Sequence, residues 1–381
     1  MEKPMETRKN HINKLLWALV AGIVIPDFGV GLYAGTLGFA AKVDYPTGLA
    51  PNRIAAGDFN RDGKLDLVTS NYNGNSVSVL LGMGNGTFNP HLDYPVGAFP
   101  NSVAVGDVNR DGKPDLAVTS GNVVSVLLGK GNGIFNPKVD YPIGSVNAVA
   151  TAVAVADLGY DGKPDLIVTN FYGNVVCVLS GRGDGTFDTH VDYPTGAYPD
   201  AIAVGDLNRD GRPDIAIENE GDNTLGVLLN DGKGVFKPKA TYPAGTFSQA
   251  AALGDFNRDG KLDVVTPSFR GNALSVLLGN GDGTLGAEVN YPTGQSPTGV
   301  AVADMDGDTK LDLVAANYYG NTVSVLKGLG NGAFQVKLDY ATGRVPFSVV
   351  LGDWNGDGKL DVAVPSQLDN SVSVLMNKTA F

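Results

Sequence analysis

The chain has 381 residues, of which 43% are hydrophobic, and a formal net charge of −12. Its 52 glycines and 21 prolines, beside only 18% charged residues, favour many short strands joined by tight turns and argue against a mainly helical protein. The negative charge argues against a protein that binds nucleic acid or anionic membranes, because no basic surface is available to attract phosphates.

The first part of the chain differs from the rest. An apolar stretch at 15–25 is too short for a comfortable transmembrane helix but suits the centre of a signal peptide. The basic residues ahead of it are Lys3, Arg8, Lys9 and Lys14. We therefore assign 1–34 to a signal-like or anchor segment and 35–381 to the folded part. A secreted or cell-surface protein is expected, extracellular or periplasmic, with no membrane insertion beyond the N-terminal segment.

The folded part is a repeat. Nonapeptides related to D-F-N-R-D-G-K-L-D begin at Asp58, Asp107, Asp157, Asp206, Asp255, Asp304 and Asp353, at intervals of 49 or 50 residues. A second marker, the tyrosine of a D-Y-P-T-G phrase, recurs at Tyr45, Tyr94, Tyr141, Tyr193, Tyr242, Tyr291 and Tyr340. Two independent markers therefore predict seven repeats of about 49 residues.

Each repeat contains four stretches typical of short β-strands. Three of them show period-two alternation, as at 102–107, 115–120 and 123–129, and a fourth follows the G-N-G-T-F turn, as at 88–94. Four antiparallel strands in about 50 residues are typical of a propeller blade. We predict an all-β fold, a seven-bladed β-propeller of four-stranded antiparallel blades.

The two ends of the chain predict how the ring closes. Residues 35–48 match only the last strand of a repeat, whereas 371–381 end after the third strand. The N-terminal strand should therefore complete the last blade, which removes the open strand edges of the ring.

The nonapeptide is rich in oxygen ligands. Ca²⁺ takes about six to eight oxygen ligands, and a short loop supplies them from alternate positions. Positions 1, 3, 5 and 9 offer side-chain oxygens, position 7 offers a backbone carbonyl, and Gly at position 6 permits the turn. In the first loop these ligands are Asp58, Asn60, Asp62, Asp66 and the carbonyl of Lys64, whose side chain is expected to point away.

The other loops extend this prediction to as many as seven Ca²⁺ ions, one per blade. Their predicted ligands are Asp107, Asn109, Asp111, Lys113, Asp115, Asp157, Asp161, Lys163, Asp165, Asp206, Asn208, Asp210, Arg212, Asp214, Asp255, Asn257, Asp259, Lys261, Asp263, Asp304, Asp306, Asp308, Lys310, Asp312, Asp353, Asn355, Asp357, Lys359 and Asp361. A hairpin turn alone needs only one or two such residues, and crowded carboxylates repel each other without a cation. Mg²⁺ is less favoured because it gives up its water reluctantly.

Two loops depart from the pattern. The loop at Asp157 has Gly159 in place of a position-3 oxygen, so it is expected to bind Ca²⁺ most weakly. The sixth loop gains Asp306 but places Thr309 at the turn position, where a β-branched residue tolerates positive φ poorly. A bound metal in a slightly altered loop is expected there.

These motifs resemble the FG-GAP and VCBS repeats, which form the propellers of integrin alpha-subunit heads and of many secreted bacterial proteins. The likeness covers roughly 35–381 and rests on the D-x-[ND]-x-D-G-x-x-D loops, the D-L-[AV]-V strands and the G-[ND]-G-T-F turns. It implies a seven-bladed ring with the Ca²⁺ loops between the first two strands of each blade, on one face. In integrins the opposite face carries the ligand, which corresponds here to loops such as 46–51 and 95–101.

The sequence holds no nucleophile elbow, zincin helix or P-loop, and the near-equivalence of the blades argues against catalysis, which needs an asymmetric site. We predict a monomeric, non-enzymatic adhesion or interaction scaffold with a protein or glycan ligand on the face opposite the calcium loops. One alternative is a lectin-like module with one sugar per blade interface, suggested by the repeated tyrosines. A less favoured one is a polysaccharide lyase or hydrolase. The segments 145–150 and 218–223 break the repeat and are the places to look for function.

Overall fold

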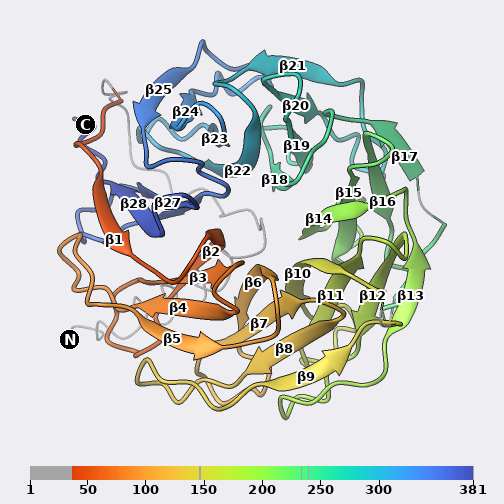
Figure 1. Ribbon diagram of the computed structural model, residues 1–381. Helices are drawn as coiled ribbons and strands as arrows, with labels where there is room; N and C mark the ends of the chain where they lie inside the picture. The colour runs from red at the N-terminus through yellow and green to blue at the C-terminus, as the bar shows by residue number, and fades with distance from the viewer. Residues whose placement is uncertain (1–36, 146, 233, 239, 381) are drawn as a thin grey trace, which may run out of the picture.

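The computed structural model describes residues 37–145, 147–232, 234–238 and 240–380. The signal-like segment lies outside these residues. Seven four-stranded antiparallel sheets are arranged around a central axis (Figure 1), which confirms the predicted propeller. Within the described residues, no helix is long and apolar enough to cross a membrane.

The innermost strand of each blade is rich in Ala, Gly and Val, which suits the crowded axis. These strands are β2 (Pro51–Gly57), β6 (Pro100–Gly106), β10 (Ala150–Ala156), β14 (Pro199–Gly205), β18 (Ala252–Gly254), β22 (Pro297–Ala303) and β26 (Val350–Gly352). The second strands each begin with the position-9 aspartate of the loop and are buried along their whole length. They are β3 (Asp66–Asn71), β7 (Asp115–Ser120), β11 (Asp165–Asn170), β15 (Asp214–Asn219), β19 (Asp263–Ser268), β23 (Asp312–Asn317) and β27 (Asp361–Ser366).

The third strands alternate in sequence but are buried on both faces, because each face packs on a neighbouring blade. They are β4 (Ser76–Leu80), β8 (Val123–Leu127), β12 (Val175–Leu179), β16 (Thr224–Leu228), β20 (Ala273–Leu277), β24 (Thr322–Leu326) and β28 (Ser371–Leu375). The outer strands are mostly exposed. They are β5 (Leu92–Pro95), β9 (Val139–Pro142), β13 (Val191–Pro194), β17 (Ala240–Pro243), β21 (Val289–Pro292), β25 (Leu338–Ala341) and β1 (Val43–Pro46).

The outer strand is shorter than the predicted stretch 88–94. In the first blade, Phe88 makes an isolated bridge with Gly82, and the strand proper starts at Leu92. Pro90 lies between them and has no N–H to donate to the ladder, so regular pairing cannot start earlier.

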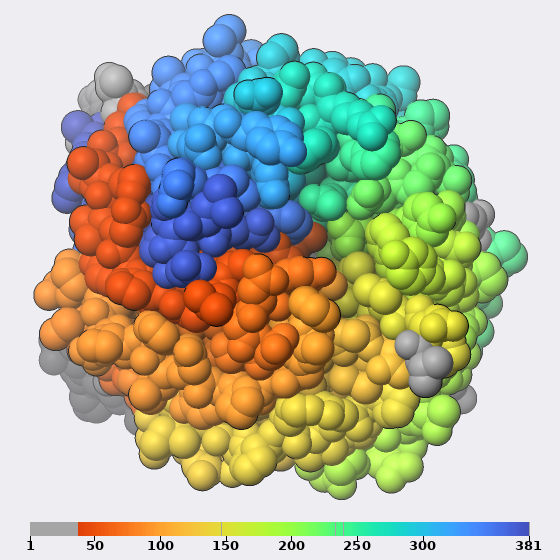
Figure 2. Space-filling view, in the orientation of Figure 1, coloured from red at the N-terminus to blue at the C-terminus, as the bar shows by residue number. Residues whose placement is uncertain are grey.

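The hydrophobic core lies between the blades. Seven clusters of buried residues each combine side chains from two neighbouring blades, as where Val68 and Val79 of the first blade meet Val103 and Leu116 of the second. The space-filling view (Figure 2) shows the blades in contact all around the axis. Burial of each aliphatic side chain contributes about 1.5–3 kcal/mol, so the interfaces between blades hold the ring together.

The repeated tyrosines join neighbouring blades. In the first blade, the Tyr94 hydroxyl donates to the carbonyl oxygen of Gly133 in the next blade (3.1 Å), and its ring packs edge-on against Phe135 at 5.4 Å. The tyrosine of every other blade donates to a backbone carbonyl of its neighbour in the same way. These tyrosines are therefore part of the blade interface.

The N-terminal strand closes the ring, as predicted. Strand β1 pairs antiparallel with β28, in the order β1-β28-β27-β26 (Figure 1, red beside blue). The residues before it also take part, since Leu37 is buried between the sixth and seventh blades and Phe39 packs on Tyr340 at 4.8 Å. The last blade thus has four strands from both ends of the chain.

Candidate metal loops and an axial pocket

The predicted metal loops lie together at one end of the inner strands. In the first blade, β2 ends at Gly57, the loop runs from Asp58, and Asp66 opens β3 opposite Gly57. The other six loops occupy the same place between their first and second strands. All the predicted ligands therefore gather on one face of the ring, near its axis.

Side chains at positions 1 and 3 turn inward over the loop. The two carboxylate oxygens of Asp58 accept hydrogen bonds from the amides of Asp62 (3.0 Å) and Gly63 (2.9 Å). The Asn60 amide oxygen accepts from the same Asp62 amide (3.0 Å). The same three bonds form in the loops at Asp107, Asp206, Asp255 and Asp353. Each oxygen keeps a second lone pair for a cation.

The position-9 aspartate has a structural role that the sequence did not reveal. Asp66 is fully buried, and its two oxygens accept from the amides of Phe59 (2.8 Å) and Gly82 (2.7 Å). The equivalent aspartate makes both bonds in all seven blades. Burial, with the negative charges of Asp58 and Asp62 adding to it, raises the pKa of Asp66 to about 7 despite these amides. A nearby divalent cation would favour its charged form.

The side chain at position 7 does not point away, which corrects the expectation for Lys64 and its equivalents. In five loops the position-7 lysine lies beside the position-5 carboxylate, as in the 2.8 Å ion pair of Lys163 with Asp161. Arg212 lies beside Asp210 in the same way at 3.4 Å. The hydrogen bond from the Lys163 ammonium, followed by that from its amide, lowers the pKa of Asp161. The position-5 carboxylates thus gain a compensating charge that does not depend on a metal.

The third loop keeps its turn without a position-3 oxygen. Asp157 still accepts from the amides of Asp161 (3.2 Å) and Gly162 (2.9 Å), although Gly159 offers no side chain. The fold therefore tolerates the missing ligand. Its expected effect is confined to metal binding.

The sixth loop differs in charge. Oxygens of Asp304, Asp306 and Asp312 lie within 4.8 Å of one another. Asp306 is fully buried, and the Lys327 ammonium lies in direct contact with it. The contact is an ion pair between the buried carboxylate and the lysine. Leu81 and its equivalents in three other blades occupy the position of Lys327. The sixth blade therefore has one additional negative charge at Asp306 and one additional positive charge at Lys327.

Backbone torsion explains the loop glycines and exposes one conflict. Gly63 has a φ of 82°, and five other loops also place glycine there, but Thr309 takes a φ of 67° at the same position. Thr309 thus has the positive φ that a β-branched residue tolerates poorly, and the sixth loop nevertheless keeps the three hydrogen bonds of the other loops. Position 4 also has positive φ, as at Arg61 (60°), which the sequence pattern did not indicate.

The residues present fit Ca²⁺. Five loops combine inward-facing carboxylate and amide oxygens with a buried carboxylate, the hard oxygen donors that this ion prefers. Ligation by the predicted residues stays a prediction.

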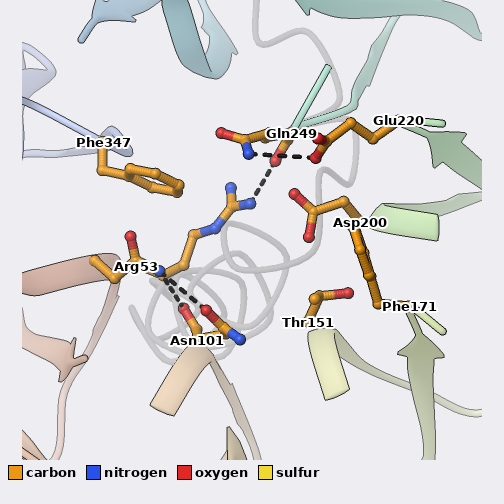
Figure 3. A pocket seen from close by; sticks show the side chains of 9 residues that line it. Arg53, Asn101, Thr151, Phe171, Asp200, Glu220, Gln249 and Phe347 are labelled. Atoms are coloured by element: carbon orange, nitrogen blue, oxygen red, sulfur yellow. Dashed lines mark hydrogen bonds between the residues drawn. The ribbon is translucent and has the colours of Figure 1, made fainter. Parts of the chain in front are cut away.

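A pocket of about 280 Å³ lies on the axis at the opposite end of the inner strands (Figure 3). Asn52 and Asp200 lie at the second residue of β2 and β14, whereas the metal loops follow the last residue of these strands. At about 3.3 Å of rise per residue, the strands separate the two regions. The pocket is lined by Asn52, Arg53, Asn101, Thr151, Phe171, Asp200, Glu220, Gln249 and Phe347.

Arg53 enters this pocket as its one cation among the lining residues. Its guanidinium donates to the carbonyl oxygen of Gln249, across the axis, and lies over the ring of Phe347 at 5.3 Å. Burial lowers the pKa of Arg53, and the negative charge of Asp200 opposes that shift. Most of its donors stay available to the cavity, because a guanidinium carries five N–H groups.

Three acidic groups lie on the facing side. Burial raises the pKa of Asp200 to about 7, although Arg53 lowers it, and burial raises that of Glu220. Glu220 also accepts from the Gln249 side chain at 3.4 Å. Behind them, Glu218 is fully buried, with the hydroxyl groups of Thr266 and Ser248 beside its carboxyl group. Burial raises the pKa of Glu218 well above its ordinary value.

The sequence analysis did not identify this pocket, although a signal was present. Arg53 stands where the other six blades have a small residue: Ser102, Ala152, Ala201, Ala250, Gly299 and Ser348. The segment 218–223, which breaks the repeat, does contribute Glu220 to the pocket. A search of the equivalent positions for residues that depart from the repeat would have found both Arg53 and Glu220.

One further cluster lies at the ring's edge. The thiol of buried Cys177 lies close to Asp192 and His190. Five of the six other blades place a serine there, as where Ser78 donates to Asp93 at 2.6 Å. Burial raises the pKa of Cys177, so its thiol stays protonated and replaces the serine hydroxyl in the core.

A family model described as an FG-GAP-like repeat matches 58–118, 107–168, 160–217, 215–266, 267–315 and 304–364. The chain belongs to this family. The matched segments each contain a metal loop. No curated protein sequence matches the chain.

Solved structures with similar folds have different functions. A lectin from Agrocybe aegerita that recognises non-reducing terminal N-acetylglucosamine is 20% identical, with a TM-score of 0.55 over 76% of this chain and 80% of the lectin. Virginiamycin B lyase from Staphylococcus aureus is 17% identical, with a TM-score of 0.59 over 91% and 99%. A periplasmic gluconolactonase from Pseudomonas aeruginosa is 18% identical, with a TM-score of 0.60 over 77% and 86%. At such identities they show the fold alone.

Proposed function

We propose that this FG-GAP propeller is a calcium-stabilised, non-enzymatic interaction scaffold, secreted or displayed at the cell surface. The observation that carries the proposal is the set of seven loops on one face, each of which brings at least three carboxylates together, although the position-7 lysine or arginine of six loops pairs with the position-5 carboxylate. Calcium is expected to cross-link the start of each loop to the buried carboxylate that begins the second strand. The metal therefore has a stabilising role and takes no part in a reaction.

The face opposite the loops offers a surface for a protein or glycan partner. Large side chains on its connections are exposed, as for Leu49 (57%), Phe99 (54%) and Tyr172 (62%). Some of them pair, as Tyr72 does with Phe99 at 5.3 Å. Apolar groups that lie together on an otherwise polar surface support a binding role for this face.

The lectin-like alternative with one sugar per blade interface loses its support. The repeated tyrosines that suggested it donate their hydroxyls to the next blade and pack their rings on phenylalanines, as Tyr193 does with Gly234 and Phe236. Their polar and apolar surfaces are thus engaged within the protein.

The test is thermal unfolding of the purified protein with excess Ca²⁺, with excess Mg²⁺ and with EGTA. Loss of even two sites, each contributing about 2.7 kcal/mol at a hundredfold excess of free ion over Kd, should lower Tm by about 7 °C or more. Calorimetric titration of the metal-free protein should give several Ca²⁺ ions per chain. An unchanged melting curve in EGTA would contradict the proposal.

A further inference from the structure

We propose that the axial pocket binds one terminal unit of a neutral saccharide. This site lies beyond the proposed calcium scaffold, since none of its lining residues belongs to a metal loop. It gives the chain a single asymmetric site in a ring whose outer parts repeat.

The neutral polar groups that line the pocket are hydrogen-bonded within the protein. Amides around the pocket are already used, because Gln367 donates to Asn52 (2.8 Å), Asn52 to the Asn101 carbonyl (3.3 Å), and Asn101 to Ala150 (3.3 Å). Thr151 donates to Pro199 at 3.0 Å. These bonds join neighbouring inner strands into a rigid belt. They leave ligand recognition to the charged groups.

The charged groups of Arg53 and Asp200 face one another without forming a direct ion pair. Arg53 and Asp200 both point into the cavity (Figure 3), and they are not in direct ion-pair contact. Glu220 lies beside them at the rim, on the segment that follows β15. A buried guanidinium and a buried carboxylate each gain from a hydrogen-bonding ligand placed between them.

The charge balance selects the kind of ligand. Arg53 repels a cation, whereas Glu220 and Asp200, which is charged in part near its pKa of about 7, repel an anion, so neither an amine nor an acidic sugar is favoured. A hydroxyl group both donates and accepts, so adjacent hydroxyls can bond to the guanidinium and to a carboxylate at once. A neutral polyhydroxylated molecule meets this requirement.

Two sides of the pocket are apolar. Phe171 and Phe347 lie on opposite sides of Arg53 (Figure 3), where the apolar face of a sugar ring could pack. Outside the pocket, Tyr198 stacks on Phe171 at 4.9 Å and remains 44% exposed. Tyr198 thus extends the aromatic surface outward, where a second sugar unit of an oligosaccharide would lie.

The size of the cavity limits the depth of binding. At about 280 Å³ it lies just below the range of about 300–1,000 Å³ found for small-molecule sites, so it accepts a single ring. One site per chain and recognition of a chain end are therefore expected.

The experiment is a glycan array with neutral, amino and acidic glycans, followed by calorimetry with the best hit and its terminal monosaccharide. One site per chain is expected, with neutral glycans preferred and the disaccharide bound more tightly than the monosaccharide. Asp200→Asn and Arg53→Ser should each weaken binding at least about tenfold, since each leaves a ligand hydroxyl without its charged partner. Arg182→Ser, which removes an exposed arginine elsewhere, is the matched control.

A third variant separates the pocket from its rim. Tyr198→Ala should reduce affinity for the disaccharide more than for the monosaccharide, a pattern that general loss of structure would not give. Circular dichroism and melting curves show whether each variant folds. No neutral glycan hit, binding that survives both pocket substitutions, or binding of free amino acids instead would overturn the inference. Measurement with Ca²⁺ present keeps this result separate from the calcium test, which needs no sugar.

Discussion

The two ends of the inner strands differ in how far their residues repeat from blade to blade. At the loop end, the same residue types make the same hydrogen bonds in blade after blade, and even the altered sixth loop compensates for its extra charge. At the axial end, the equivalent second positions carry seven side chains of five kinds: Asn52, Asn101, Thr151, Asp200, Gln249, Thr298 and Phe347. Repetition serves stability, because every blade must solve the same folding problem. Divergence allows recognition, because one ligand on the axis meets all the blades at once.

The largest expected effect concerns the position-9 aspartates, which we regard as structural as well as metal-binding. Asp263→Ala removes the acceptor of two buried amides, those of Phe256 and Gly279. In EGTA it should cost about 4 kcal/mol of unfolding free energy, and Asp255→Ala, in the more open part of the same loop, about 1 kcal/mol. Urea unfolding measures both. Equal losses of unfolding free energy in EGTA for the two variants would contradict a structural role of Asp263 beyond metal binding.

The sixth loop provides the next test. Lys327→Leu introduces the residue of four other blades but leaves Asp306 buried without its ion pair. It should destabilise the metal-free protein by about 3 kcal/mol, and the double variant Lys327→Leu with Asp306→Asn should recover most of this loss. Calcium should rescue the single variant in part. If the single variant is as stable as the parent in EGTA, the lysine has no compensating role.

The axial end should show its own dependence on pH. The raised pKa of Asp200, about 7, means that the folded state holds a proton that the unfolded state releases near pH 4. Stability is therefore full below about pH 4 and falls as pH rises through 7. Arg53, Glu220 and Glu218 also face this group and shape the curve.

Asp200→Asn should remove part of this fall, on the order of 2 kcal/mol between pH 5 and pH 8. Melting curves over that range, in constant Ca²⁺, provide the measurement. Asp188→Asn changes the charge equally at an exposed site and is the control. The same slope in the parent and in Asp200→Asn would show that the carboxyl is ionised at no cost.

The smallest expected effect is a gain in stability. Thr309 takes a positive φ where other loops have glycine, so Thr309→Gly should stabilise the protein by about 1 kcal/mol. Thr309→Ala keeps a Cβ and should give little gain. Calcium affinity of this loop should change little, because Thr309 contributes its backbone amide and no predicted ligand. Destabilisation by glycine would contradict the strain.

The sequence alone predicted the fold because the physics of a blade is local. Alternating side chains, tight turns and a 49-residue interval recur, so the blade number and the closure by the N-terminal strand followed from comparing the repeats. The loop positions of Asp58 and its equivalents followed for the same reason. What failed at this level was side-chain direction, since the exposed Lys64 ammonium lies beside the carboxylate of Asp62.

Only the tertiary structure decided what the position-9 aspartates and the tyrosines contact, and that the axis holds a pocket. Asp66 reaches an amide sixteen residues away, and Arg53 reaches Gln249 across the ring, at separations that no local pattern encodes. Such contacts depend on how the seven blades pack together, and on which residue each blade places at the axis. Local periodicity in the sequence specifies a single blade, whereas closure of the ring brings charged residues from distant parts of the sequence into one cavity.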